Sequence, residues 1–262
     1  MMPTRLHAPG EAGSQGLPML RRYMRAVIGD QMVGDRLAAT LWRGMSDDAR
    51  ADGDATRVFA AATRAWRRAG TAPPARPFSG RSLLSSVPSG LTLPRQVGVL
   101  TDVFGLTVAQ AAGVLDRSEG EITRLLAETR RERRDPLSLD LLVVEDNPLI
   151  AEHLARIGRA QGARVRTARN HAEALRLADD TPPTIAICDY DLGPGPNGIA
   201  VVRALFEDHD TTSLFVTAYP DEVLQGADGE PAFVLPKPFS EQRVAAALHY
   251  AARAQRPALL AA

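Results

Sequence analysis

The chain has 262 residues, 45% of them hydrophobic, and its 31 basic and 31 acidic side chains leave no net charge at pH 7. The single cysteine, Cys188, excludes a disulfide or a cysteine-based metal site within the chain. No apolar run reaches 18 residues and no signal peptide is recognisable, so we expect a soluble, cytoplasmic protein without a membrane span.

Charge divides the chain into two unlike halves. Residues 1–135 carry 20 basic and 14 acidic side chains, a net charge of +6, whereas residues 136–262 carry 11 and 17, a net charge of −6. The length exceeds that of a usual single domain, so two domains are expected. Their opposite charges predict a charge-assisted contact between them.

The N-terminal half is predicted to be all α. Residues 1–16 are rich in glycine and proline and are expected to form a flexible tail. The spacing of apolar residues then predicts helices over 17–28, 34–45 and 54–69. The polar face of the first helix is basic, with Arg21, Arg22 and Arg25. Residues 71–90 contain four prolines and are predicted to be a linker with a short helix at 82–85.

Three more helices are predicted between residues 91 and 135, over 93–104, 108–115 and 118–134. Gly105 supplies a turn and Thr107 an N-cap between the first two of them. This arrangement is similar to a helix-turn-helix, in which residues 119–131 would occupy the position of the recognition helix.

The C-terminal half alternates between short apolar runs and helical patterns. The runs at 141–144, 184–188, 213–217 and 232–235 predict buried strands. The patterns that follow them predict helices over 147–160, 170–179, 198–207 and 240–254. Strands that alternate with helices indicate an α/β domain with a parallel sheet covered on both faces.

Lys237 is the only lysine among the 31 basic residues, and it lies between two prolines just past the last predicted strand. Its compact ammonium suits a point-charge contact with an anion. The other three strands end in Glu145 and Asp146, in Asp189, and in Thr217. Because parallel sheets bind ligands at the carboxyl ends of their strands, we expect these side chains to share one pocket.

The chemistry of this pocket follows from its charges. Three carboxylates close together repel one another unless a cation is present, and oxygen ligands suit Mg²⁺. An ion, Lys237 and the Thr217 hydroxyl would neutralise phosphoryl oxygens, with Asp189 as the nucleophile that forms an aspartyl phosphate. Each residue alone has a plainer interpretation, as a helix-terminal acid, a loop acid or a strand residue. Their order at four strand ends favours the phosphoryl site.

Residues 138–254 resemble the receiver domain of two-component response regulators, a flavodoxin-like, doubly wound fold with a five-stranded parallel sheet. The resemblance implies that Asp189 is the phosphoacceptor and that a histidine kinase or phosphotransferase is the phosphodonor. It implies that Thr217 and Lys237 bind phosphoryl oxygens and that the Lys237–Pro238 peptide is cis.

The resemblance also implies the ligands of the metal ion. Asp146 would bind Mg²⁺ directly, Glu145 would bind it through water, and Asp191 would bind it through its backbone carbonyl.

The chain departs from many receivers at one position. These carry an aromatic residue three positions before the lysine, where the pose of the ring reports phosphorylation. Here that position is Val234, and Phe233 should face the other side of the sheet. Residues 215–220 resemble the Phe-x-Thr-Gly/Ala-x-Tyr signature of an atypical receiver group, which makes Tyr219 a candidate switch. The alternative is that Tyr219 is an ordinary half-exposed ring in a loop.

The helical half resembles extracytoplasmic-function sigma factors. Residues 17–70 resemble their minus-10-binding domain, and residues 91–135 resemble their minus-35-binding domain. A sigma-like half followed by a receiver is the architecture of PhyR-type regulators of the alphaproteobacterial general stress response. The stretches Leu-Pro-x-Leu-Arg-Arg-Tyr and Glu-Asp-x-Pro-Leu-Ile-Ala are close to that family. The resemblance implies a partner switch in which the phosphorylated protein sequesters a NepR-type anti-sigma factor and so releases the true sigma factor.

DNA binding is disfavoured by the start of the predicted recognition helix. Glu119 and Glu121 would oppose the phosphate contacts that dominate affinity for DNA. A basic stripe follows them, formed by Arg124, Arg130, Arg131, Arg133 and Arg134. This stripe leaves a receiver-gated transcription factor or sigma factor as the alternative function.

An enzyme is not expected. A phosphohydrolase similar to the haloacid dehalogenases would need its Asp-x-Asp motif on the first strand, whereas Asp189-Tyr190-Asp191 follows a later one. A monomer is the expected oligomeric state.

Overall fold

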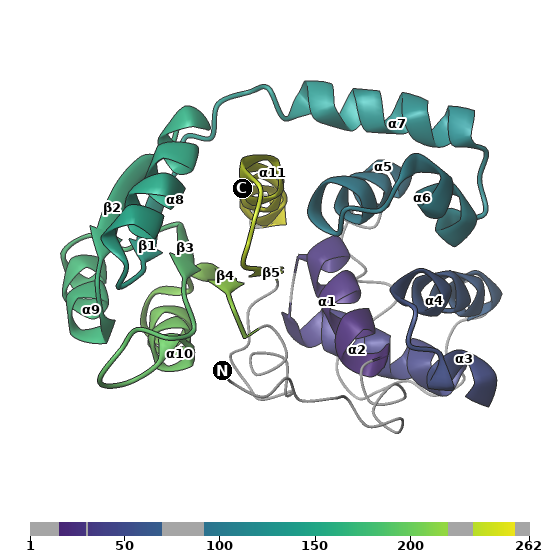
Figure 1. Ribbon diagram of the computed structural model, residues 1–262, viewed down its shortest axis with the longest axis horizontal. Coiled ribbons are helices and arrows are strands. Elements are labelled where there is room, and N and C mark those ends of the chain that lie inside the picture. The colour runs from purple at the N-terminus through teal and green to yellow at the C-terminus, as the bar shows by residue number, and fades with distance from the viewer. Residues whose placement is uncertain (1–15, 30, 70–91, 220–232, 255–262) are drawn as a thin grey trace, which may run out of the picture.

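A computed structural model describes residues 16–29, 31–69, 92–219 and 233–254 (Figure 1). The predicted tail, apart from Gly16, lies outside the described residues. The predicted linker over 71–90, with its short helix at 82–85, also lies outside them.

Four helices form the first part of the sigma-like half: α1 (Gly16–Ile28), α2 (Gln31–Arg43), α3 (Asp47–Ala51) and α4 (Ala55–Ala69). The short helix α3 was not predicted, and Ser46 caps its N-terminus. Helices α1 and α2 cross closely at Gly34, where a Cβ would lie 2.7 Å from the Arg25 Cα. Arg25 is fully buried and pairs with Asp35 over 2.5 Å. The sequence placed Arg25 on the basic polar face of α1, but the structure buries its side chain.

The second part comprises α5 (Leu93–Gly98), η3 (Val99–Val103), α6 (Val108–Leu115) and α7 (Glu119–Glu132). The predicted continuous helix over 93–104 widens at Val99 into the π-helical turn η3. Thr107 caps α6 as predicted, because its hydroxyl accepts from the Gln110 amide while the Gln110 side chain accepts from the Thr107 amide.

The C-terminal half has a parallel sheet in the order β2-β1-β3-β4-β5, the flavodoxin-like order. Its strands are β1 (Asp140–Val144), β2 (Arg164–Ala168), β3 (Ile185–Cys188), β4 (Thr212–Thr217) and β5 (Phe233–Pro236). Its helices are α8 (Pro148–Ala160), α9 (His171–Asp180), α10 (Gly198–His209) and α11 (Glu241–Ala254). The edge strand β2 carries Arg164 and Arg166, which explains why no apolar run predicted its position.

The two faces of the sheet belong to different cores. One face packs with α9 and α10 in a core that includes Phe215 and Val234. The other packs with α8 and α11, and its core continues without interruption into the sigma-like helices. Helix α11 lies between the sheet and the sigma-like half in Figure 1 and contacts η3. None of the described helices is long and apolar enough to cross a membrane.

Candidate functional site

The predicted pocket forms at the carboxyl ends of β1, β3, β4 and β5. Glu145 and Asp146 follow β1, and Asp189 follows β3. One carboxylate oxygen from each of these three residues lies within 4.8 Å of the others. Glu145 is only 1% exposed and Asp189 8%, whereas Asp146 is exposed. The three carboxylates offer oxygen ligands alone, as a hard divalent cation requires.

Lys237 bridges the two buried carboxylates. Its Nζ lies 2.6 Å from Asp189 Oδ2 and 2.8 Å from Glu145 Oε2. The other oxygen of Asp189 accepts a hydrogen bond of 2.7 Å from the Tyr190 amide. The Lys237–Pro238 peptide is cis. The sequence prediction that Lys237 and Asp189 meet is thus confirmed.

Burial and charge act against each other in this bridge. Burial raises the pKa of Glu145, and the hydrogen bond from Lys237 only partly offsets this rise. Burial alone would lower the pKa of Lys237, but the hydrogen bonds to Asp189 and Glu145 and the charges of these carboxylates together outweigh burial and raise the pKa. The ammonium therefore stays protonated and holds two carboxylates that would otherwise repel each other.

The remaining predicted residues lie around this bridge. The loop after β3 places Gly193 beside Asp146, since a Cβ on Gly193 would lie 3.6 Å from Asp146 Oδ2. Asp191 belongs to the same loop, and its carboxylate accepts from the Gly193 amide. Thr217 is fully buried, and its hydroxyl accepts a hydrogen bond of 3.0 Å from the Tyr219 amide.

Tyr219 is 47% exposed, and its ring lies 6.1 Å from that of Tyr190, centroid to centroid. The sequence drew attention to Tyr219 but not to Tyr190. No local signal reveals this pair, because the two rings come from loops after different strands.

The last strand connects the pocket to the sigma-like half. As predicted from strand alternation, Phe233 and Val234 belong to cores on opposite faces of the sheet. The carbonyl of Val234 accepts a hydrogen bond of 2.8 Å from the Arg22 guanidinium of α1. Arg22 also lies over the ring of Phe104. Sequence reasoning placed Arg22 on a polar face and missed this contact.

The two halves carry opposite net charges, but the described ion pair between them does not follow these net charges. In the described part of the chain, the ion pair that joins the two halves is Arg253 with Glu132, at 2.9 Å. Here the acidic half supplies the cation and the basic half supplies the acid, so net charge did not predict this contact. Buried apolar residues, arginine-to-carbonyl hydrogen bonds and arginines that lie over the Tyr250 ring also contribute to the described interface.

A buried histidine lies in this interface. His249 of α11 is 3% exposed, and its Nε2 lies 3.2 Å from Gln161 Oε1. Burial lowers the pKa of His249 from 6.5 to about 4, and Arg133 and Arg253 add to this effect. The titratable and charged groups that face His249 or line the polar cavity beside it are Asp102, Arg130, Arg133, Asp135 and Arg253.

Acid is therefore expected to loosen the contact between the halves. The packed state binds fewer protons than the separated state, so its advantage is complete above pH 6.5 and is lost as pH falls toward 4. Hydrogen exchange of α11 at pH 7 and pH 5 would measure this loss, with His249→Gln as the comparison. Identical acid sensitivity in the wild type and the variant would contradict the expectation.

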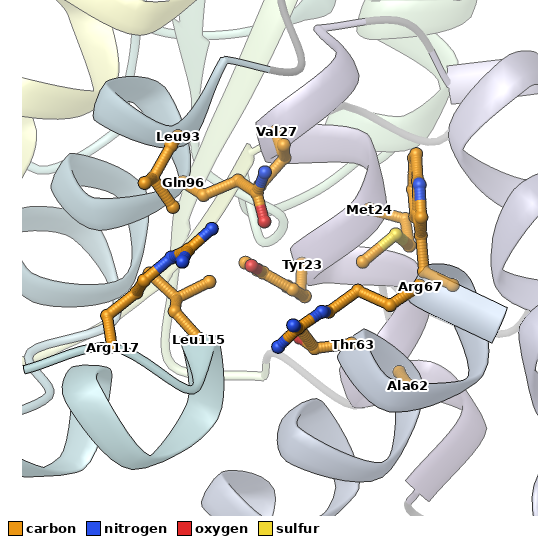
Figure 2. A pocket seen from close by; sticks show the side chains of 11 residues that line it. Tyr23, Met24, Val27, Ala62, Thr63, Arg67, Leu93, Gln96, Leu115 and Arg117 are labelled. Carbon is orange, nitrogen blue, oxygen red and sulfur yellow. The ribbon is translucent and has the colours of Figure 1, made fainter. Parts of the chain in front are cut away.

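A groove of about 290 Å³ lies between the two parts of the sigma-like half. Figure 2 shows the side chains from α1 and α4 facing Leu93, Gln96, Leu115 and Arg117 across it. Apolar side chains such as Met24 line the groove. So do Arg67, which pairs with Asp116 over 2.5 Å, and Arg117, which lies 3.8 Å from Glu121. This combination suits a partner that presents an apolar side chain next to a carboxylate.

Helix α7 is poorly equipped to bind a DNA backbone. Glu119 at its start is exposed. Arg124 pairs with Glu128, and both Arg130 and Arg133 pair with Asp102. Three arginines of the predicted basic stripe thus already have carboxylate partners within the sigma-like half.

Known proteins share this two-part architecture. Residues 141–249 match the response regulator receiver domain, and residues 14–60 match the sigma2 domain of PhyR. The chain is 31% identical over 244 residues to the phyllosphere-induced regulator PhyR of Methylorubrum extorquens, which covers 90% of this chain and 91% of that protein. Its fold is similar to the response regulator PhyR from Brucella abortus, with a TM-score of 0.74 and 26% identity over 94% of this chain and 95% of that one. A mutant of the anti-anti-sigma factor PhyR from Bartonella quintana has a TM-score of 0.76 and 25% identity over 92% and 95%.

Proposed function

Because the chain belongs to the PhyR family of response regulators, we propose that phosphorylation of Asp189 frees its sigma-like half to sequester a NepR-type anti-sigma factor. The observation that carries the proposal is a direct connection through β5. This strand leads to Lys237, which bonds to Asp189, while its Val234 carbonyl bonds to Arg22 of the sigma-like half. A change at the phosphoacceptor can therefore reach the domain contact through one short strand.

The pocket has the groups that a phosphoacceptor needs. A carboxylate oxygen of Asp189 would attack the phosphorus of a phosphohistidine, and the bond from phosphorus to the imidazole nitrogen would break as the new bond forms. Asp146, Glu145 and the carbonyl of Asp191 would hold Mg²⁺. The ion supplies charge neutralisation for the phosphoryl oxygens. The all-oxygen donor set and the excess of carboxylates over ammonium groups support this assignment.

Lys237 and Thr217 would convert phosphorylation into movement. The phosphoryl group adds a charge of about −1.5 to −2 beside the Lys237 ammonium. Lys237 would then exchange its bond to Glu145 for a bond to a phosphoryl oxygen. The Thr217 hydroxyl would donate to another phosphoryl oxygen. Because the Tyr219 amide bonds to this hydroxyl, Tyr219 would move together with Thr217. Thr217 ends β4, which contacts α11, and Lys237 follows β5, which contacts α1. Movement of these two residues would therefore destabilise the closed arrangement of receiver and sigma-like half.

The groove between α1, α4, α5 and α6 is the docking surface that we assign to the anti-sigma factor. Its apolar lining fits the apolar face of an amphipathic helix, and acidic residues on that helix would replace Asp116 and Glu121 as partners of Arg67 and Arg117. The alternative, a receiver-gated DNA-binding protein, would depend on α7 and on Arg124.

A capture experiment separates these two functions. Purified protein is treated with acetyl phosphate and Mg²⁺ and then mixed with a NepR-type anti-sigma factor. We expect phosphorylation to raise capture at least about tenfold and Arg117→Glu to weaken it by a similar factor. Arg124→Glu makes the same charge change outside the groove and should capture normally. Salt-sensitive binding to promoter DNA that Arg124→Glu abolishes, with no capture, would overturn the proposal.

A further inference from the structure

One buried cation joins three helices of the two halves. Arg95 of α5 is 9% exposed, and within the described residues its guanidinium donates to three backbone carbonyls. Its Nε lies 2.6 Å from Val27 O, and its Nη2 lies 3.0 Å from Ala26 O and 3.0 Å from Tyr250 O. No carboxylate among the described residues pairs with it. Burial lowers its pKa to about 10, which leaves the group charged at neutral pH.

The carbonyls come from both sides of the domain contact. Ala26 and Val27 lie in the last turn of α1, where carbonyls have no partner within their own helix. Arg95 therefore caps α1 from a neighbouring helix. The third carbonyl belongs to Tyr250 of α11, and the guanidinium also lies 5.3 Å from the centre of the Tyr250 ring. A separation of α11 would remove one carbonyl and one ring from a buried charge.

The surroundings of Tyr250 are shaped for this contact. Arg133 of the sigma-like half lies 5.5 Å from the same ring. Gly98 lies directly against the tyrosine hydroxyl, and a Cβ at Gly98 would collide with it. The absence of a side chain at Gly98 thus lets α11 approach closely enough for the Tyr250 carbonyl to reach Arg95.

The same arginine adjoins the partner groove. Val27, whose carbonyl it caps, and its chain neighbour Gln96 both contribute side chains to the groove. Arg95 holds α1 and α5 together at this point while α11 is docked.

We propose that Arg95 is a latch that couples the docking of α11 to the arrangement of α1 and α5 at the groove. This latch rests on the proposed function, because the contact between Arg95 and Tyr250 is the one that phosphorylation of Asp189 would have to break. When α11 leaves, Arg95 loses the Tyr250 carbonyl and ring and becomes hydrated. Water then competes for its bonds to Ala26 and Val27, so α1 and α5 are held together less firmly.

The test measures opening without any partner protein. Small-angle scattering and hydrogen exchange of α11 report the open fraction in Mg²⁺, with and without beryllofluoride as the phosphoryl mimic. We expect Arg95→Ala to raise the ratio of open to closed molecules about tenfold without beryllofluoride, because it removes a charged hydrogen bond and a cation–π contact. Arg95→Lys should open partially, since a lysine keeps the charge but cannot reach all three carbonyls together. Arg124→Ala is the matched exposed control and should stay closed.

Two variants on the facing surfaces keep the test decisive if Arg95→Ala does not fold. Gly98→Ala should open the protein by collision, and Tyr250→Leu should open it by removing the ring. A double-mutant cycle of Arg95→Ala with Tyr250→Leu should be non-additive. Closed molecules in all these variants would overturn the latch. Open molecules that fail to capture an anti-sigma factor would instead overturn the proposed function.

Discussion

Asp189→Asn is expected to abolish phosphorylation completely. The asparagine amide keeps the size of the side chain but lacks the carboxylate that attacks phosphorus. The single amide oxygen of asparagine can keep either the hydrogen bond from the Tyr190 amide or the contact with Lys237, but not both. Lys237 still bonds to Glu145, so the domain should remain folded. Intact-mass spectrometry after incubation with acetyl phosphate and Mg²⁺ would show no phosphoryl adduct on the variant.

The control for this experiment is Asp208→Asn, which neutralises an exposed carboxylate in α10 and should be labelled like the wild type. Chelation of Mg²⁺ in the wild type should have the same effect as Asp189→Asn, because the phosphoryl oxygens then lack their main counter-charge. Undiminished labelling of Asp189→Asn would mean that another carboxylate is the acceptor, with Asp146 the first to test.

Lys237→Met is expected to destabilise the receiver by about 3 kcal/mol when metal is absent. Glu145 and Asp189 are both buried, and removal of the ammonium leaves them facing each other without a counter-charge. Added Mg²⁺ should restore much of the loss, since it would supply a cation to the same oxygens. Urea unfolding of the variant and the wild type, in EDTA and in Mg²⁺, measures both effects.

The stability of Lys237→Met is expected to depend on pH through Glu145. Burial already raises the pKa of Glu145, and the loss of Lys237 removes the hydrogen bond that opposes this rise. The folded variant therefore binds protons more readily than the unfolded chain, so its stability should fall as pH rises. Lys237→Arg keeps the charge and should be more stable than Lys237→Met. An equal loss of stability in EDTA and in Mg²⁺ would contradict a metal site at these carboxylates.

The local elements of the fold were predictable because their causes are local. Buried strands show as apolar runs, and helix starts show as capping residues such as Thr107, the predicted N-cap, which the structure shows in a capping box. The pocket was predictable for a related reason: parallel strands must bring their carboxyl ends to one edge, so Asp189 and Lys237 had to approach each other. The edge strand β2 escaped prediction because its arginines interrupt the apolar pattern.

The contacts between the halves were decided by tertiary structure alone. Arg22 and Val234 are separated by 212 positions, and Arg95 and Tyr250 by 155. No periodicity or motif distinguishes an arginine that faces solvent from one that donates to a distant carbonyl, because every backbone carbonyl looks alike in the sequence. Net charge predicted attraction between the halves, yet the described ion pair between them has the opposite polarity. The sequence by itself determined the two domains and the strand-end pocket. Only packing decided which arginines connect them, since shape and burial, rather than charge totals, select the partners of a buried cation.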